Sequence, residues 1–196
     1  MKTLALLGTT LGFAFSAGLN LYATVLVIGV AIRWGWVSLP PDLASLSLLA
    51  DNTVLAAAAL LYAVEFLADK IPAVDHVWDA IHTVIRPVGA MWIGWRTIGG
   101  SGLSEPVEIV LLLAAGGVAL SSHVGKAGTR VATASVGGHF LGLGIVLSLV
   151  EDVLAFLIAP LALLMPLLIL GVVALGLVAA FFGWRAFRRR KRLVRA

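Results

Sequence analysis

The stretch SAGLNLYATVL, from Ser16 to Leu26, places serine, glycine and asparagine in the middle of an apolar run, Thr3–Ile32. A straight helix needs about 20 residues to cross the hydrocarbon core of a bilayer, so the run is too long for one span and too short for two. A break near Ser16–Asn20 resolves the mismatch, because it gives two shorter helical pieces or one long kinked helix. Broken helices are tolerated in membranes where they line a cavity or are buried in protein.

The composition of the chain is that of an integral membrane protein. Of its 196 residues, 61% are hydrophobic and only 12% are charged, and the mean hydropathy is +1.06. A soluble domain needs far more polar surface than this. The chain has no cysteine, which excludes disulfides and thiolate metal sites.

Basic residues gather at the end of the chain. Seven of the fourteen Lys and Arg residues lie in residues 185–196, directly after the apolar run Leu161–Phe182. A basic tail after an apolar helix is typical of the cytoplasmic side of a membrane, so we expect a multi-pass protein with a cytoplasmic C-terminus. Anionic membrane lipids are the expected partners of this tail, and nucleic acid is not.

Apolar runs predict an all-α fold, a polytopic membrane helix bundle with about six membrane segments. The runs that follow the first are Thr53–Ala68, Val107–Leu120, Phe140–Ala159 and Leu161–Phe182. Residues 1–184 form a single transmembrane domain on this interpretation, and residues 185–196 form the basic cytoplasmic tail. The stretch Asp75–Arg86 is amphipathic, which is also typical of a helix lying on the membrane surface with its polar face in water.

An internal repeat divides the chain into halves of about 3–99 and 106–182. The segment GFAFSAGLNLYAT (Gly12–Thr24) aligns without a gap with GVALSSHVGKAGT (Gly117–Thr129), and VE at Glu65 aligns with VE at Glu151. Duplications in membrane proteins often have inverted topology, with the functional site at the repeat interface near the bilayer midplane. The repeat therefore predicts paired helix breaks, one in SAGLN and one in SSHVGK (Ser121–Lys126).

Four stretches carry a resemblance to a known family: LNLYATVLVIG, VEFLADKIPAVDHVWDAIHTVIRPVGA, KAGTRVATASVGG and SLVEDVLAFLIAPLALL. The chain resembles, over nearly its whole length up to Phe182, the bacterial integral-membrane proteins of the family called domain of unknown function 4126. The resemblance implies a polytopic protein of the bacterial inner membrane. It implies no activity and supplies no functional residues.

Acidic residues at membrane depth are the main candidates for a site, because ionisable groups there are costly and usually face a cavity or a partner. Glu65 and Asp69 share a helix face, and Glu151 and Asp152 lie as deep in the matching helix. Carboxylates brought together from two halves can bind a cation or share a proton. The alternative is that each carboxylate pairs structurally with a base from the other half, such as Arg130.

Two bases four residues apart, Lys126 and Arg130, share one face if their segment is helical. Together with the hydroxyls around Ser121 they could hold an anion such as phosphate; the alternative is an ordinary basic cytoplasmic loop. The segment is not a phosphate-binding Walker A loop, because Leu120 and Ala127 stand where that motif needs glycine and a hydroxyl.

Metal and enzymatic sites are weaker interpretations. Asp75, Asp79 and His82 share a helix face, but no HExxH spacing occurs and the adjacent Arg86 would oppose a cation. No G-x-S-x-G motif is present. We therefore expect no metal, no cofactor and no enzymatic activity.

The sequence favours a small transporter of an ion or small solute, with proton or cation coupling through intramembrane carboxylates. An ion channel and a non-transporting membrane scaffold or assembly protein are the alternatives. The expected site residues are Ser16, Asn20, Glu65, Asp69, Ser121, Lys126, Arg130, Glu151 and Asp152. The expected partners are membrane lipids, a small ion or solute, and a second copy in a homodimer, because a thin bundle with this many buried charges would gain from a partner subunit.

Overall fold

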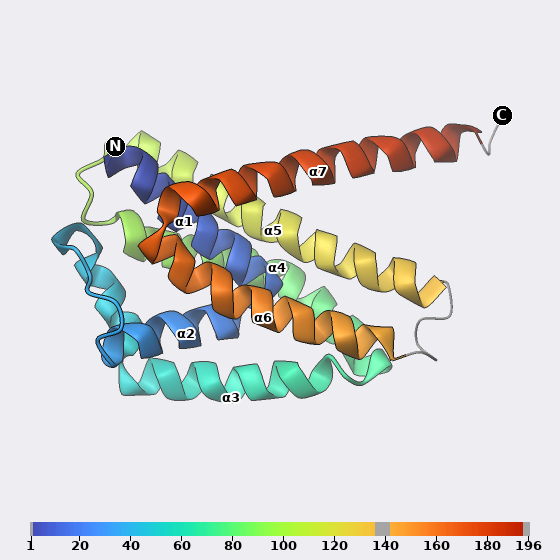
Figure 1. The fold of residues 1–196 in the computed structure, drawn as a ribbon, viewed down its shortest axis with the longest axis horizontal. Helices are drawn as coiled ribbons and strands as arrows, with labels where there is room; N and C mark the ends of the chain where they lie inside the picture. The colour runs from blue at the N-terminus through green and yellow to red at the C-terminus, as the bar shows by residue number, and fades with distance from the viewer. Residues whose placement is uncertain (1, 136–141, 194–196) are drawn as a thin grey trace.

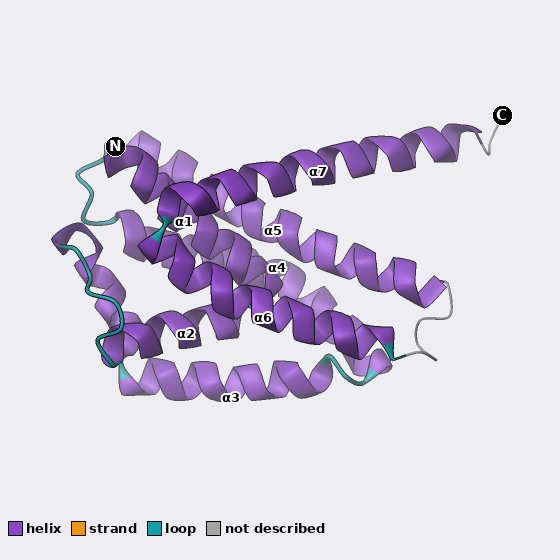
Figure 2. Cartoon of the chain, in the orientation of Figure 1, coloured by secondary structure: helices purple, strands orange, loops and turns teal. Residues whose placement is uncertain are grey.

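The computed structural model describes residues 2–135 and 142–193. These residues form an all-helical bundle, as the sequence predicts, and no strand occurs among them (Figure 2). The elements are α1 (Lys2–Leu19), α2 (Leu21–Arg33), the 3-10 helix η1 (Pro41–Ala50), α3 (Asn52–Ala68), α4 (Pro72–Ile98), α5 (Glu105–Ser135), α6 (Leu143–Leu164) and α7 (Pro166–Leu193). The two termini lie at opposite ends of the bundle in Figure 1.

The predicted break in the first apolar run is a hairpin. At Asn20 the backbone is extended, with φ −152° and ψ 107°, and the Asn20 side chain accepts a hydrogen bond from the backbone N–H of Ala23 as the N-cap of α2. From this turn α2 runs back toward the end at which α1 begins (Figure 1), where Arg33 donates to the carbonyl of Ala50. We call Lys2–Arg33 the N-terminal hairpin and Asn20 its tip.

The remaining long helices alternate in direction between the two ends of the bundle. Helix α3 starts at the N-terminal end and α4 returns to it, α5 leaves that end and α6 returns, and α7 leaves it again toward the C-terminus (Figure 1). Proline begins both α4, at Pro72, and α7, at Pro166, where its missing N–H costs nothing. Helix α7 continues to Leu193, so the basic residues between Arg185 and Arg192 prolong the last helix.

Helix α1 is the centre of the bundle and packs against α4, α5, α6 and α7. Phe13, Ala14 and Ala17 are fully buried. Small residues let the neighbouring helices approach closely, since a Cβ added at Gly18 would lie 2.2 Å from the carbonyl oxygen of Ala119 in α5. The hairpin is therefore held inside the bundle rather than lying on its surface.

Three helices among the described residues are long and apolar enough to cross a membrane: Glu105–Thr133 in α5, Leu143–Leu164 in α6 and Pro166–Gly183 in α7. A fourth crossing arises if η1 and α3, which are bent by 62° at Asp51, count as one span. The predicted run Phe140–Ala159 corresponds to α6, although Phe140 lies outside the described residues. The structure thus confirms that the bundle has helices suited to a membrane, and three or four of the described helices meet this criterion.

The second predicted helix break is wrong, because α5 runs without interruption through Ser121–Lys126. The hydroxyl groups in this region bond back to their own helix: Ser122 Oγ donates to the carbonyl of Ala119 and Thr129 Oγ1 to that of Lys126. Such bonds satisfy the side chain without ending the helix. An asparagine cap like Asn20 is missing from this stretch, so the helix continues.

The alternative of a surface helix over Asp75–Arg86 is also wrong. This stretch belongs to α4, whose charged face is turned into the bundle: Asp75 and Asp79 are 7% and 8% exposed, and Arg86 is fully buried. The opposite face carries the exposed apolar side chains, such as Val77 and Val84. The helix is amphipathic with its polar side inward, which suits a membrane environment.

The close approach of α1 to α5 predicts unequal effects of two Gly-to-Ala substitutions. Gly18→Ala should destabilise the protein by about 1–3 kcal/mol, because the new methyl group meets the backbone of α5. Gly117→Ala is the control, since nothing lies within 4 Å of a Cβ at Gly117. Thermal unfolding in detergent measures both variants, and equal melting temperatures for the two would contradict the packing described.

Candidate functional site

The tip of the N-terminal hairpin lies among charged side chains. The last carbonyls of α1 accept bonds from two cations: Arg86 Nη1 lies 3.0 Å from the oxygen of Gly18, and Lys126 Nζ lies 3.3 Å from that of Leu19. Cations are favoured at the C-terminal end of a helix, where the unpaired carbonyls concentrate negative charge. On the other side of the break, Asn20 Nδ2 donates to Asp152 Oδ1 at 2.9 Å. The break thus supplies polar backbone and an amide to a buried charged cluster.

Arg130 of α5 connects four carboxylates from three parts of the chain. Its Nη2 lies 2.8 Å from Asp69 Oδ2 and 2.7 Å from Glu151 Oε2. Its Nη1 contacts Asp75 and lies 3.5 Å from Asp79 Oδ2. The planar guanidinium with its several N–H donors is suited to this bridging role.

Lys126, one turn before Arg130, connects the two halves of the chain. Its Nζ lies 3.3 Å from Asp69 Oδ2, 3.4 Å from Glu151 Oε2 and 3.8 Å from Glu65 Oε1. Glu65 and Glu151 are the two residues that the sequence alignment of the predicted halves places opposite each other. The structure therefore brings them to the same ammonium group.

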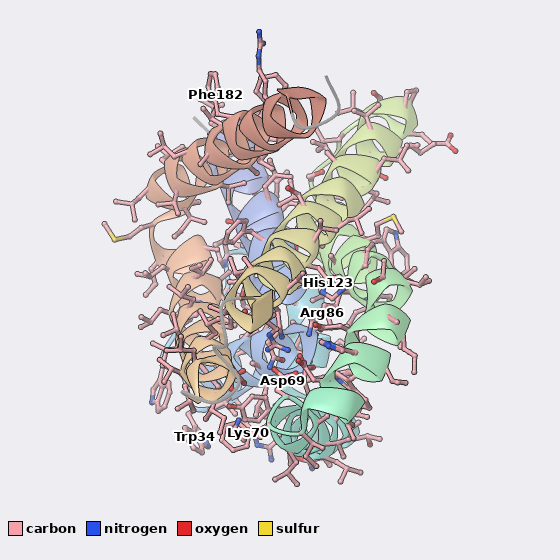
Figure 3. The ribbon with its side chains drawn as sticks, turned by 90° about the vertical axis from the view of Figure 1, so that its right-hand side faces the viewer. Trp34, Asp69, Lys70, Arg86, His123 and Phe182 are labelled. Carbon is pink, nitrogen blue, oxygen red and sulfur yellow. The ribbon has the colours of Figure 1, made fainter. Side chains whose placement is uncertain are left out.

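Arg86 of α4 is the third buried base and pairs with Glu65, its Nη2 lying 2.6 Å from Oε1. Its Nη1 lies 2.6 Å from His123 Nδ1. A guanidinium can only donate, so Nδ1 accepts and the proton of a neutral His123 is on Nε2, which lies 3.1 Å from the carbonyl oxygen of Asp79. The contacts thus fix one tautomer of this histidine. Figure 3 shows Asp69, Arg86 and His123 within the bundle, with Lys70 farther toward its edge.

His82, on the same face of α4 as Arg86, extends the cluster toward the hairpin. It is 1% exposed, its Nδ1 lies 2.8 Å from the carbonyl oxygen of Trp78, and its Nε2 lies 3.0 Å from the hydroxyl of Tyr22 in α2. Since a carbonyl only accepts, Nδ1 donates and Tyr22 donates to Nε2 when the ring is neutral. The sequence singles out His82 only in the metal interpretation and does not single out Tyr22.

Acids outnumber bases among the buried charges of the described residues. The buried acids are Glu65, Asp69, Asp75, Asp79, Glu151 and Asp152, and the buried bases are Arg86, Lys126 and Arg130, each at most 8% exposed. We call these nine residues the charge network. Three of its carboxylate oxygens, Glu65 Oε2, Asp79 Oδ1 and Asp152 Oδ2, are buried without a hydrogen-bond partner. Lys70 stays outside it, with its Nζ 2.8 Å from the carbonyl oxygen of Phe66 and over the ring of the same residue.

The chain matches the family described as "Domain of unknown function (DUF4126)" over residues 7–186. The chain belongs to the DUF4126 family. No curated protein and no solved structure matches it. The matched range contains the tip of the N-terminal hairpin and every residue of the charge network.

Most of the predicted site residues meet in this DUF4126 chain. Glu65, Asp69, Lys126, Arg130, Glu151 and Asp152 belong to the charge network, and Asn20 joins it through Asp152. Ser16 is buried one turn away, where its hydroxyl bonds to Thr24 Oγ1 and the carbonyl of Ala155 and so holds the hairpin closed. Ser121 is not brought into the site, since it is Ser122 that faces α1 and donates to the carbonyl of Phe15.

The surroundings of Lys126 and Arg130 change the interpretation of both residues. Both are buried in a helix, so the alternative of a cytoplasmic loop is wrong. Carboxylates surround both cations, an arrangement that repels an anion such as phosphate. Ion pairing, which the sequence leaves open as the alternative role of the carboxylates, is therefore the dominant feature of the site.

The carboxylates of Asp69, Asp75 and Asp79 form the one group of acids among the described residues that is close enough to share a metal ion. Three of their oxygens lie within 4.8 Å of one another. The guanidinium of Arg130 contacts all three residues. The positive charge of Arg130 lies against all three carboxylates and would repel a metal cation, so these ligands do not fit a metal ion.

The DUF4126 chain also has a pocket of about 330 Å³ near the opposite end of α1. Thr9, Asp42, Ser101 and Pro166 are among the residues that line it, and none of its lining residues belongs to the charge network. The carboxylates of the charge network are therefore separate from this pocket, although Asp42 lines it.

Removal of Arg130 should destabilise the protein more than removal of an exposed arginine. Arg130→Met leaves four carboxylates without their shared cation, and breaking a buried pair in this way costs about 3–5 kcal/mol. Arg33→Met is the control, because Arg33 is exposed and bonds only to the carbonyl of Ala50; its cost should stay within about 1 kcal/mol. Thermal melting in detergent measures the two, and a similar loss for both would show that the network does not hold the bundle together.

Proposed function

We propose that the chain is a small membrane transporter of an ion or small solute, coupled to a proton or another cation through the carboxylates of the charge network. The observation that carries the proposal is the excess of acids, six against three bases. Uncompensated charge inside a membrane is costly, so protons or a cation must balance the network. Groups that take up such charge at membrane depth commonly mark ion pathways.

The exposure of the side chains supports access to the network from one end. The side chains of Asp75, Asp79 and Glu151 are 9–11% exposed, whereas those of Glu65 and Arg86 are fully buried. Asp75 and Asp79 lie in the first turns of α4, near the end of the bundle to which α7 carries the basic tail. We propose that protons enter from this end, which the basic tail marks as cytoplasmic.

We further propose six membrane-embedded segments: five passes, formed by η1–α3, α4, α5, α6 and α7, and the re-entrant N-terminal hairpin. Helix α4 is long enough for a pass, at 27 residues, but its charges face inward and lower its overall hydropathy. This arrangement puts the N-terminus outside and the C-terminus in the cytoplasm of a bacterial cell.

The inverted repeat remains a proposal with support from one pair of helices. Tyr62 contacts Phe156 and Asp69 accepts from Ser148, so α3 and α6 are antiparallel, as inversion requires. Helices α1 and α5 are parallel, since Phe15 contacts Ser122 and Leu19 contacts Lys126. Inversion therefore accounts for the pairing of Glu65 with Glu151, but not for the alignment of Gly12–Thr24 with Gly117–Thr129.

A non-transporting scaffold is the second candidate, and the dense pairing around Arg130 favours it. A scaffold predicts no flux of any ion, and a channel predicts conductance without coupling in planar bilayers. An enzymatic role has no support in the site. We also propose a homodimer. The buried charges do not require one, because a single chain buries all nine residues of the charge network.

Neutralising Glu65 should abolish transport without unfolding the protein. Glu65→Gln keeps the shape of the side chain but removes a charge that Arg86 and Lys126 share. We expect proteoliposomes with the wild-type protein to show flux under imposed gradients of pH, divalent ions or phosphate, and the variant to show none. Glu105→Gln, at the exposed start of α5, is the control and should keep wild-type flux. Normal flux through folded Glu65→Gln would remove Glu65 from the proposed mechanism.

The proposed topology can be tested with single cysteines, because the native chain has none. Ser38→Cys, in the loop after α2, should react with a membrane-impermeant maleimide in intact spheroplasts. His76→Cys, in the first turns of α4, should react only after the membrane is permeabilised. The reverse pattern would place the basic tail outside the cell.

A further inference from the structure

The ammonium group of Lys126 lies in a cage of four oxygen atoms at the hairpin tip. Three are carboxylate oxygens, of Asp69, Glu151 and Glu65, at 3.3, 3.4 and 3.8 Å, and the fourth is the carbonyl oxygen of Leu19 at 3.3 Å. The Lys126 side chain is 1% exposed. The second oxygen of Glu65, Oε2, is fully buried and has no hydrogen-bond partner.

The ligands of this cage are those of a small monovalent cation. Carbonyls at an unwound helix break together with carboxylates coordinate Na⁺ in membrane proteins with discontinuous helices. Here the same types of oxygen meet at the tip of a broken helix, but the positive charge at their centre is the ammonium group of Lys126 in α5. Lysine differs from a free ion because its side chain ties it to the helix.

Other charged groups surround the cage on every side. Arg86 of α4 shares Glu65, Arg130 of α5 shares Asp69 and Glu151, and Asp152 of α6 lies beside Glu151 in sequence and bonds to the tip. Arg130 also fills the space among Asp69, Asp75 and Asp79. Both clusters of oxygens that could hold a free cation are thus occupied by side chains of the chain itself.

We infer that Lys126 is the built-in occupant of a monovalent-cation site, so that the native protein binds no free Na⁺ or K⁺ there and the charge exchanged by its carboxylates is a proton. The inference rests on the proposed function, because it names the coupling ion of the same network. It also states what removal of the lysine creates: an oxygen-lined site of the size of an ammonium group, with excess negative charge around it.

The test is cation binding by Lys126→Ala in the purified, detergent-solubilised protein. We expect saturable binding of radioactive sodium by the variant and none by the wild type. Sodium or methylammonium chloride should raise the melting temperature of the variant by about 5 °C relative to choline chloride of equal ionic strength, because choline is too large for the cage. Lys70→Ala is the matched control, since Lys70 bonds to Phe66 outside the cage, and it should behave like the wild type.

A second variant keeps the test decisive if Lys126→Ala does not fold. The double variant Lys126→Ala/Glu151→Gln removes one charge of each sign, so the buried balance stays that of the wild type, while Glu65, Asp69 and the Leu19 carbonyl still line the vacated space. It should show the same response to sodium. A folded variant with no response to sodium or methylammonium would overturn the inference.

Measurements on the wild type separate this inference from the proposed function. Its flux in proteoliposomes should be unchanged when choline replaces Na⁺ and K⁺ on both sides. Flux that is lost in choline, or saturable sodium binding by the wild type, would overturn the inference and leave a cation-coupled transporter standing. Absence of any flux, combined with sodium binding by Lys126→Ala, would overturn the transporter and leave the built-in cation intact.

Discussion

Charges buried in a membrane protein must find their partners within the protein, and this constraint arranges the helices described here. Neither lipid nor the apolar interior can solvate an ion, so an isolated charge at this depth is costly. Arg130 can be buried only because Asp69, Asp75 and Glu151 reach it from three different parts of the chain. The ion pairs therefore decide which helices are neighbours: α3, α4 and α6 must all meet α5 near the level of Arg130. Apolar packing cannot make this choice alone, since lipid tails are as apolar as leucine side chains.

The broken N-terminal hairpin belongs to the same arrangement. A continuous helix through Asn20 would bond its carbonyls internally and leave Lys126 and Arg86 without the oxygens of Leu19 and Gly18. The break leaves these two carbonyl oxygens free to accept hydrogen bonds from the two cations. The side chain of Asn20 caps α2 with its oxygen and donates to Asp152 with its nitrogen. The polar residues in the middle of an apolar run thus have one physical role: they bring a helix end, with its partial charge, into the interior of the bundle.

The sequence predicts the helical class, the hairpin break and most of the site, because these depend on local composition and on the cost of buried charge. The depth of Glu65 and Glu151 in their runs is visible in the sequence, and so is the spacing of Lys126 and Arg130. The continuity of α5 could not be predicted from the repeat, since Ser and Gly residues are compatible with both a break and a helix, and the bonds of Ser122 decide the outcome. The sequence also could not predict that the polar face of α4 is turned into the bundle. An amphipathic pattern shows that one face is polar, but the ion pairs of Arg86 and Asp75 determine whether that face meets water or protein.

The two ends of the bundle differ in a way that bears on how a carrier of this kind would work. On the side of the hairpin tip toward the C-terminal end of α7, the network reaches Asp75 and Asp79, whose side chains are 10% and 11% exposed. On the other side α1 is packed tightly, since a Cβ at Gly12 would lie 2.7 Å from Ala162 and one at Gly8 would lie 2.1 Å from the carbonyl oxygen of Pro166. The 330 Å³ pocket reaches this packed region at Thr9 and Pro166. A pathway from the pocket to the network therefore requires α1 to separate from the α6–α7 junction. Because α1 ends at the hairpin tip, a rigid-body movement of α1 would also shift the Gly18 and Leu19 carbonyls away from Arg86 and Lys126. In the proposed transporter, opening at the pocket end and rearrangement of the buried charges would then be one motion, which is the coupling that alternating access needs.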